Sequence, residues 1–379
     1  MSAHIAVIGA GVIGLQTAAS LLEAGFKVTI IAKQFPGDES IEYTSPWAGA
    51  IWRTHSSPDQ KEQCQWDLES YHSWMNAVDS DEKAALEMGL KRRPISVYSG
   101  SSTQSTADTP WFAPHVENFS IIPPSALPPN CTSGHTYTSI AVNPPIYISH
   151  LLAKANSLGA HTIRADLPSS SGLSSAISAA LSLLLNSTPS NSNHGVPIVV
   201  NCTGLSSHTL VPDPTVYPIR GQTLLARITP PPDPSTLGIF LREDPAISPL
   251  ATYIFPRPGT DLFVLGGTKT SRSWDAEPDE WITKGIIERC RNVWPEMRDS
   301  GIEVVATQVG LRPGREGGVR IEVENVDVEL DGRVNERKGK ENGTVRVVHQ
   351  YGHAGAGYQL SLGSAGKVVR IVKELVGMQ

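Results

Sequence analysis

The sequence predicts an α/β protein in which a Rossmann-like domain is interleaved with a second domain built mostly on antiparallel strands. A buried-strand pattern at residues 5–8 runs into the turn GAGVIG at 9–14, and a strand-like Val pair at 347–348 leads into the Gly/Ala-rich loop YGHAGAGY at 351–358. Both segments place glycine where the backbone can approach a bound group closely. Because they stand at opposite ends of the chain, we expect the Rossmann-like domain to be assembled from distant segments.

The turn at residues 9–14 has the GxGxxG spacing. Its first glycine permits a tight turn, its second lets the chain approach a pyrophosphate at a helix N-terminus, and its third allows close helix–strand packing. We expect the following helix to stop at Gly25 and residues 28–31 to form the next strand, which completes a βαβ unit. A dinucleotide site is therefore predicted. Lys33 follows that strand where a carboxylate normally takes the ribose hydroxyls, which disfavours an ordinary NAD site.

Length and composition exclude several classes of protein. The 379 residues exceed one ordinary domain, and the hydrophobic share of 40% suits a globular protein with a substantial core. The net charge of -6 and the scattered basic residues give no footprint for nucleic acid. We expect no membrane span, no secretory leader and an intracellular protein, since a strand begins at residue 5 and no apolar run is long enough. The four cysteines lack CxxC spacing, so we expect free thiols and no metal site.

The interleaving follows from where the motifs stand. The turn at 9–14, the segment VNCTG at 200–204 and the C-terminal loop are expected to converge on one ligand. The segments assigned to the dinucleotide-binding domain are 1–55, 140–212 and 305–379, and those assigned to a substrate-binding domain are 56–139 and 213–304. Within the second set, residues 216–226 and 251–268 have the apolar pattern of strands broken by Pro and Gly turns.

Six motifs occur in order along nearly the whole chain. They are SPWAGA at 45–50, VNCTG at 200–204, IRGQ at 219–222, YIFPRPG at 253–259, VGLRP at 309–313 and the stretch from HQYG to GSA at 349–365. With these motifs the chain resembles the D-amino acid oxidase and D-aspartate oxidase family. Within the C-terminal motif, only Gln350 is unusual for that family. The resemblance implies an FAD enzyme that oxidises D-amino acids with molecular oxygen, giving a 2-oxo acid, ammonia and hydrogen peroxide.

The resemblance also implies a set of residues around FAD, drawn from both ends and the middle of the chain. They are Gly9, Ala10, Gly11, Val12, Ile13, Gly14, Lys33, Thr44, Ser45, Ala48, Gly49, Ala50, Leu167, Cys202, Gly204, Ala354, Gly355, Gly357, Tyr358 and Gln359.

Three residues are expected to hold the reacting part of the substrate. Hydride transfer from Cα is flavin chemistry, so the protein needs a fixed cation for the α-carboxylate rather than a general base. Arg312 matches the family's carboxylate-binding arginine, and its planar fork suits a two-point contact. Tyr253 matches the tyrosine whose hydroxyl meets the same carboxylate, and Gly355 the position that receives the α-amino group.

Four basic residues are expected at the side-chain end of the substrate. Lys269 follows Gly-Gly-Thr where the acidic-substrate branch has arginine, while Arg242 and His55 match basic residues of that branch and Arg53 adds a further donor. Cations gathered in one pocket repel one another unless an anion binds there. We therefore expect an acidic substrate, D-aspartate or D-glutamate. The alternative is broad oxidation of neutral D-amino acids, with these basic side chains pointing outward.

Two other functions and the cellular context stay open. A glycine or sarcosine oxidase would share the GxGxxG start, and a non-catalytic protein could use FAD as a structural element. The expected partners are a small D-amino acid and oxygen, with no nucleic acid and no membrane, and homo-oligomerisation is left open. The resemblance implies a peroxisomal enzyme, but the chain ends VGMQ rather than in a Ser-Lys-Leu-like tripeptide, which leaves a cytoplasmic location as the alternative.

Overall fold

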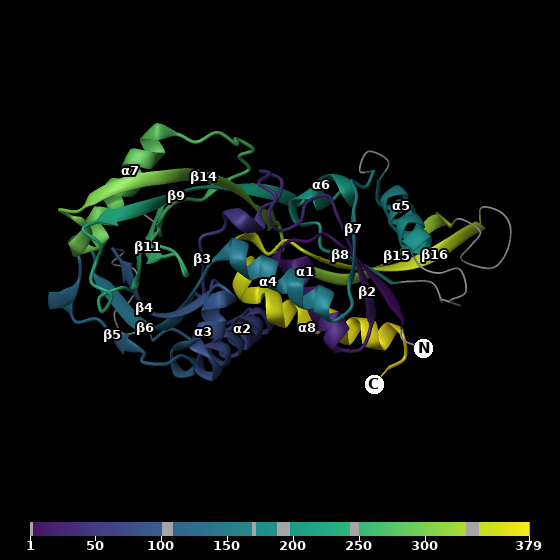
Figure 1. Cartoon of the computed structure of the whole chain (residues 1–379), viewed down its shortest axis with the longest axis horizontal. Helices are drawn as coiled ribbons and strands as arrows, with labels where there is room; N and C mark the ends of the chain where they lie inside the picture. Colours follow the sequence, from purple (N-terminus) through teal and green to yellow (C-terminus); the bar gives the residue numbers. More distant parts are fainter. Residues whose placement is uncertain are drawn as a thin grey trace. The chain divides into compact units, whose positions relative to one another are not determined.

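The computed structural model describes residues 3–100, 109–168, 172–187, 198–242, 250–330 and 341–378. Its chain divides into two compact units. Unit 1 comprises Met1–Pro46, Ile148–Pro218 and Arg312–Gln379, and unit 2 comprises Trp47–Tyr147 and Ile219–Leu311. A six-stranded sheet is the framework of unit 1, and a ten-stranded sheet is that of unit 2 (Figure 1).

The sheet of unit 1 has the order β15-β16-β8-β1-β2-β7. Its strands are β1 (His4–Ile8), β2 (Lys27–Ala32), β7 (His161–Arg164), β8 (Ile198–Asn201), β15 (Arg320–Leu330) and β16 (Glu341–Tyr351). All neighbours are parallel except the pair of β15 and β16, which run antiparallel. This mostly parallel sheet and the helix after β1 confirm the predicted Rossmann-like fold.

Helices cover both faces of this sheet. They are α1 (Val12–Glu23), α5 (Gly172–Ser187), α6 (Ser207–Leu210), α8 (Gly357–Leu375) and α4 (Pro144–Ser157), whose first residues belong to unit 2. Ala6 and Ile8 of β1 pack with Ile177 and Leu181 of α5 in one buried cluster. Because side chains alternate along a strand, the β1 residues next to Ala6 and Ile8 face the opposite side of the sheet. There α1 and α8 pack against each other, on the side of the sheet away from α5 (Figure 1).

The sheet of unit 2 is mostly antiparallel, as predicted. Its order is β13-β9-β12-β11-β10-β4-β6-β3, with β14 beside β9 and β5 beside β6, and β10 runs parallel to β4. The strands are β3 (Ala50–Ile51), β4 (Leu90–Ser99), β5 (Ser120–Ile121), β6 (Ser133–Val142), β9 (Val216–Thr229), β10 (Ile239–Arg242), β11 (Leu250–Pro256), β12 (Phe263–Thr268), β13 (Thr270–Ser271) and β14 (Gly301–Arg315). The strands expected near 216–226 and 251–268 are thus β9, β11 and β12.

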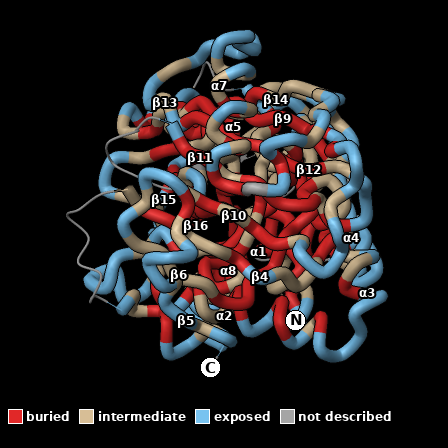
Figure 2. The backbone as a smooth tube through the Cα atoms, turned by 90° about the vertical axis from the view of Figure 1, so that its left-hand side faces the viewer, coloured by how far each residue is buried: buried red, intermediate tan, exposed pale blue. Residues whose placement is uncertain are grey.

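Among the described residues of unit 2, three α-helices lie wholly within the unit, namely α2 (Lys61–Ser80), α3 (Glu82–Glu87) and α7 (Glu280–Val293). The side chain of Asp279 caps α7 by accepting from the backbone N–H groups of Trp281 and Ile282. Ile286 and Cys290 of α7 then pack with Ile254 and other apolar residues of the sheet. Figure 2 shows strands β11 and β12 beneath as largely buried.

The unit boundaries differ from the expected domain boundaries at all four junctions. The first segment of unit 1 ends at Pro46 rather than at 55, because Trp52 N–H donates to the Ile140 carbonyl and Ala50 pairs with Val142 in the sheet of unit 2. The same pairing keeps residues 140–147 in unit 2. The later junctions shift from 212 to Pro218 and from 305 to Arg312. Ala48, Gly49 and Ala50 therefore belong to unit 2, whereas the other expected FAD residues belong to unit 1.

The four cysteines are free thiols, as expected. Cys64, Cys202 and Cys290 are buried, and burial raises the pKa of each thiol, to about 12 for Cys290. Among the helices that the structure describes, none is long and apolar enough to cross a membrane.

Candidate functional site

The turn after β1 packs backbone directly against backbone. Gly9 has φ +106°, and a Cβ added there would lie 2.6 Å from the carbonyl oxygen of Cys202. A Cβ added to Gly14 would lie 2.0 Å from the carbonyl oxygen of Gly9. Only glycine fits both positions. The predicted roles of these residues in turn formation and in helix–strand packing are therefore visible in the geometry.

The N-terminus of α1 is surrounded by small residues and by polar groups from two other segments. The Val12 N–H donates to Ser45 Oγ at 2.9 Å, and a Cβ on Gly11 would lie 3.0 Å from the same oxygen. The Tyr43 hydroxyl donates to the Ala10 carbonyl at 2.6 Å, and the Tyr358 hydroxyl of α8 donates to the Ser45 carbonyl at 2.9 Å. The first turn reads VIGL, with no side chain to fill the place of a pyrophosphate. This cradle, of residues 9–14, 43–45, 202–204 and 354–359, fits a dinucleotide.

The remaining expected FAD residues of unit 1 lie in the cradle segments or at the sheet of this unit. Lys33 is an exposed residue after β2, where Nζ pairs with Glu42 at 3.0 Å and Asp166 at 3.2 Å. Leu167 packs against the cluster under α5. Gly204 and Ala354 both adopt positive φ, +56° and +50°. Thr44 is half-buried, and Ile13, Gly357 and Gln359 lie in the first turns of α1 and α8.

Arg312 and Gly355 come together although 43 positions separate them in the sequence. A Cβ added to Gly355 would lie 3.6 Å from Cδ and 3.9 Å from Nε of Arg312. The stem of the arginine thus runs along the loop that also supplies Ala354 and Gly357 to the cradle. The arginine predicted to bind the α-carboxylate and the backbone predicted to receive the α-amino group therefore lie next to each other in unit 1.

Tyr253 lies in a glycine-lined slot of unit 2. A Cβ on Gly266, directly opposite on β12, would lie 1.9 Å from Cζ of the ring, and one on Gly267 would lie 2.8 Å from the hydroxyl oxygen. A Cβ on Gly49 would lie 3.3 Å from ring atom Cε2. Three glycines thus fix the plane of this ring. Sequence reasoning missed the role of the Gly266-Gly267 pair, although glycine inside a strand pattern signals a close approach.

Arg242 does not share a sheet face with Tyr253. Leu241 is opposite Tyr253 in the pairing of β10 with β11, while Arg242 is opposite Thr252, so the two side chains leave the sheet on different sides. The guanidinium of Arg242 donates to the Asn130 carbonyl at 3.0 Å. The strand register therefore separates these two predicted residues, which sequence spacing could not reveal.

Arg53 and His55 belong to a segment anchored by a buried carboxylate. Thr54 Oγ1 and Ser56 Oγ donate to Asp67 Oδ2 of α2 at 2.5 and 2.7 Å, so residues 54 and 56 point inward and His55 is exposed. Burial raises the pKa of Asp67 to about 6, against the opposing effects of these hydrogen bonds and of the Arg53 charge. Asp67 was not anticipated from the sequence, because a lone acid in a helix normally faces water.

Lys269 is an exposed residue between β12 and β13. Its predecessor Thr268 is buried, and its hydroxyl accepts from the Gln222 N–H at 3.0 Å. Of the basic residues expected around the substrate side chain, Lys269 and His55 are exposed and Arg53 is half-buried. Arg242 lies on the opposite face of the sheet from Tyr253.

Residues 4–371 match the family model described as FAD dependent oxidoreductase. The chain belongs to this family. Its cofactor is FAD, in agreement with the cradle in unit 1. The D-amino-acid oxidase of Fusarium vanettenii is 33% identical over 392 residues, which cover 99% of this chain and 98% of that protein. The human D-aspartate oxidase is 29% identical, covering 99% and 96%.

A solved structure supports the same fold at lower sequence identity. Glycine oxidase from Bacillus cereus superimposes with a TM-score of 0.65 at 17% identity, covering 99% of this chain and 96% of the other. This likeness concerns the fold of the FAD-dependent oxidoreductase and does not decide among substrates.

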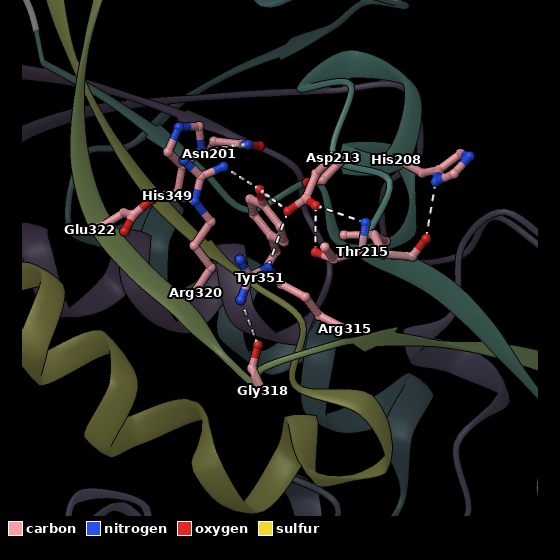
Figure 3. A network of polar contacts seen from close by, with 12 residues as sticks. Asn201, His208, Asp213, Thr215, Arg315, Gly318, Arg320, Glu322, His349 and Tyr351 are labelled. Atoms are coloured by element: carbon pink, nitrogen blue, oxygen red, sulfur yellow. Dashed lines mark hydrogen bonds and ion pairs between the residues drawn. The ribbon is translucent and has the colours of Figure 1, made fainter.

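A polar network in this oxidoreductase ties together the strands that carry Arg312 and the cradle loop. Asp213 Oδ2 accepts from Arg315 Nε at 3.1 Å and from the Tyr351 hydroxyl at 2.9 Å (Figure 3). Arg315 stands three residues after Arg312, and Tyr351 stands four residues before Gly355. Asp213 thus joins the ends of β14 and β16. Its Oδ1 accepts from the N–H and hydroxyl of Thr215.

The network continues to the cradle end of β8. Arg320 donates to the Tyr351 hydroxyl at 2.6 Å and pairs with Glu324 at 3.1 Å, and Glu324 contacts His349 Nε2 at 3.0 Å. His349 Nδ1 lies 3.1 Å from the Asn201 amide nitrogen (Figure 3). Burial, followed by the Arg320 charge, lowers the pKa of His349. The imidazole therefore bridges Glu324 and the last residue of β8 inside the protein.

We expect the stability of the oxidoreductase to depend on Asp213 above about pH 4. Burial alone would raise the pKa of Asp213, but hydrogen bonds from Thr215, Tyr351 and Arg315 outweigh it and hold the pKa below its ordinary value of 3.8. A depressed carboxyl pKa adds stability that is complete above the unfolded value and is lost as the pH falls through the folded value. Asp213→Asn should lower the free energy of unfolding by about 2–4 kcal/mol at pH 7.

Urea unfolding of wild type and Asp213→Asn at several pH values measures this difference. It should be constant at neutral pH and shrink below pH 3.8. Asp233→Asn is a matched control, since that carboxylate also has a lowered pKa but caps an exposed turn. A difference that grows on acidification would contradict the assignment.

Proposed function

We propose that the protein oxidises D-amino acids at Cα, with FAD as the hydride acceptor and oxygen as the final oxidant, and that it prefers acidic side chains. The single observation that carries the first part is the contact of Arg312 with Gly355 beside the cradle. The identity of 33% to a D-amino-acid oxidase over 99% of the chain supports the same reaction.

In this proposal unit 1 binds FAD and the α-carboxylate, and Tyr253 keeps the role that the family resemblance implies for it. When bound, FAD supplies the acceptor for a hydride from Cα. The Arg312 guanidinium holds the α-carboxylate by two parallel hydrogen bonds, which fixes the direction of the Cα–H bond. The Tyr253 hydroxyl donates to the same carboxylate, and the Gly355 carbonyl accepts from the α-amino group.

The proton that leaves the amine goes to solvent in this proposal. His353, the titratable side chain beside the loop, does not serve as the base. Burial lowers its pKa to about 3, and its Nε2 contacts Ser364 Oγ at 3.3 Å in the interior. Peroxide release from a panel of D- and L-amino acids with added FAD tests the reaction. Turnover of L- but not D-amino acids would reject it.

The acidic preference rests on the sequence match of Lys269 and His55 to basic positions of the acidic-substrate branch, with Arg53 as a further donor. Arg242 adds nothing to it, since strand register separates that side chain from Tyr253. A second candidate, broad oxidation of neutral D-amino acids, is favoured by this placement and by the higher identity to a D-amino-acid oxidase, 33% against 29% for a D-aspartate oxidase.

One measurement distinguishes the two candidate substrate preferences. If Lys269 faces a second carboxylate, kcat/KM should be higher for D-aspartate than for D-asparagine and D-alanine, and Lys269→Ala should lower the D-aspartate value roughly 10-fold, about 1.4 kcal/mol. The value for D-alanine should stay unchanged. Lys83→Ala, at an exposed position of α3, is the control. Preference for D-alanine in the wild type, with no response to Lys269→Ala, would establish the second candidate.

A further inference from the structure

Gln350 departs from the family motif, and its side chain joins three elements. It is fully buried in β16. Its Oε1 accepts from Thr17 Oγ1 of α1 at 2.6 Å and from Cys202 Sγ at 3.4 Å. Its Nε2 donates to Ser364 Oγ of α8 at 3.1 Å. One amide therefore contacts a helix, the end of a strand and a second helix.

Each of these three partners belongs to a segment of the FAD cradle or is connected to one through a neighbouring residue. Thr17 lies one turn along α1 from Gly14. The carbonyl of Cys202 is the group that a side chain at Gly9 would strike. Ser364 also contacts His353 Nε2 at 3.3 Å, and His353 precedes Ala354 in the cradle loop. The amide of Gln350 thus links the elements that carry three of the four cradle segments, 9–14, 202–204 and 354–359.

The residue type suits this position because glutamine offers an acceptor and a donor at the end of a flexible stem. Thr17, Ser364 and Gln350 are fully buried, and Cys202 and His353 are nearly so. An apolar residue at 350 would leave the Thr17 hydroxyl and the Cys202 thiol without this acceptor in a site that excludes water. Losing partners for buried donors costs free energy, which neighbouring segments can reduce only by moving apart.

We propose that Gln350 is a positioning residue that sets the affinity for FAD by holding α1, the end of β8 and the loop before α8 in register. Its side chain has no exposed surface, so it acts through the cradle and not by contact with the cofactor. In metal sites, outer partners that orient the direct ligands contribute roughly 10- to 100-fold in affinity, and we expect an effect of similar size here.

The test compares Gln350→Met with Gln16→Met. Methionine keeps the length and most of the volume of glutamine while removing the amide. Gln16 is equally a buried glutamine near the cradle, at 3% exposure, but its amide donates within its own helix, to Ser20 Oγ at 3.3 Å. FAD is added to each apoprotein and the Kd is read from flavin fluorescence. The thermal unfolding of the apoproteins is measured in parallel.

We expect the FAD Kd of Gln350→Met to rise roughly 10-fold or more, while that of Gln16→Met stays within about twofold of wild type. An unchanged Kd in a folded Gln350→Met protein, with or without a lower apoprotein melting temperature, would show that Gln350 is merely structural and overturn the proposal. If Gln350→Met fails to fold, Thr17→Val removes one of the three contacts in a near-isosteric change. A higher Kd then supports the proposal, and an unchanged Kd rejects it.

Discussion

Arg312→Ala should lower kcat/KM for D-amino acids by roughly 30- to several-thousand-fold, because the α-carboxylate loses a charge-assisted contact that contributes about 2–5 kcal/mol. Arg312→Lys should retain part of the activity, since lysine keeps the charge without the two-point geometry. The position of Arg312 along the loop at Gly355 makes this the largest kinetic effect expected from one side chain.

Steady-state kinetics with saturating FAD and a panel of D-amino acids measure the effect. The flavin spectrum and the melting temperature should stay close to those of wild type, which separates a lost substrate contact from a lost fold. Arg370→Ala, at an exposed position of α8, is the matched control and should have wild-type kinetics. Unaltered kinetics in Arg312→Ala would assign Arg312 a purely structural role.

Gly14→Ala should yield a protein that does not retain FAD. The added Cβ would meet the Gly9 carbonyl oxygen at 2.0 Å and the Gly9 carbonyl carbon at 2.9 Å, and these backbone atoms cannot move aside as the end of a flexible side chain could. The helix must shift away from β1, which moves the amides of its first turn, where a pyrophosphate would bind. Together with the strain in the turn, this should cost about 3 kcal/mol or more of stability.

Absorbance of the purified protein and urea unfolding of the apoprotein measure the two parts of this prediction. Gly285→Ala is the control, because a Cβ there meets only the end of the Arg289 side chain at 3.2 Å, within helix α7. That variant should be neutral or slightly stabilised, since alanine has the higher helix propensity. Normal FAD content in Gly14→Ala would show that the turn is looser than the backbone contact implies.

Local patterns predicted much of unit 1. The backbone contacts of the GxGxxG turn require glycine, so this motif predicts the strand, the tight turn and the helix together. The meeting of Arg312 with Gly355 could be expected only because both stand in motifs of one family. The strands β9, β11 and β12 were likewise predicted from the sequence, since turns of Pro and Gly delimit their apolar segments.

Other features depend on pairing between distant strands. Register decides that Arg242 shares a face with Thr252 and not with Tyr253, and register is invisible in residue spacing. The short strand β3 moves residues 47–55 into unit 2 through a pairing with β6 some 90 positions later. Asp67 and Asp213 look like ordinary polar residues in the sequence, and Gln350 stands out there only as an unusual residue in a motif. Their importance appears only when partners from other elements close around them.

The burial of three of the four cysteines has a consequence for the lifetime of the enzyme. The proposed reaction releases hydrogen peroxide at every turnover, and peroxide oxidises the thiolate form of cysteine. Burial raises the pKa of Cys64, Cys202 and Cys290, so these groups stay protonated and shielded at neutral pH. The thiol of Cys202, held against Gln350 at the cradle, would disrupt that packing if it became an acid. If the proposed reaction is right, the burial of Cys202 limits the oxidation of this thiol by the peroxide that the protein itself releases.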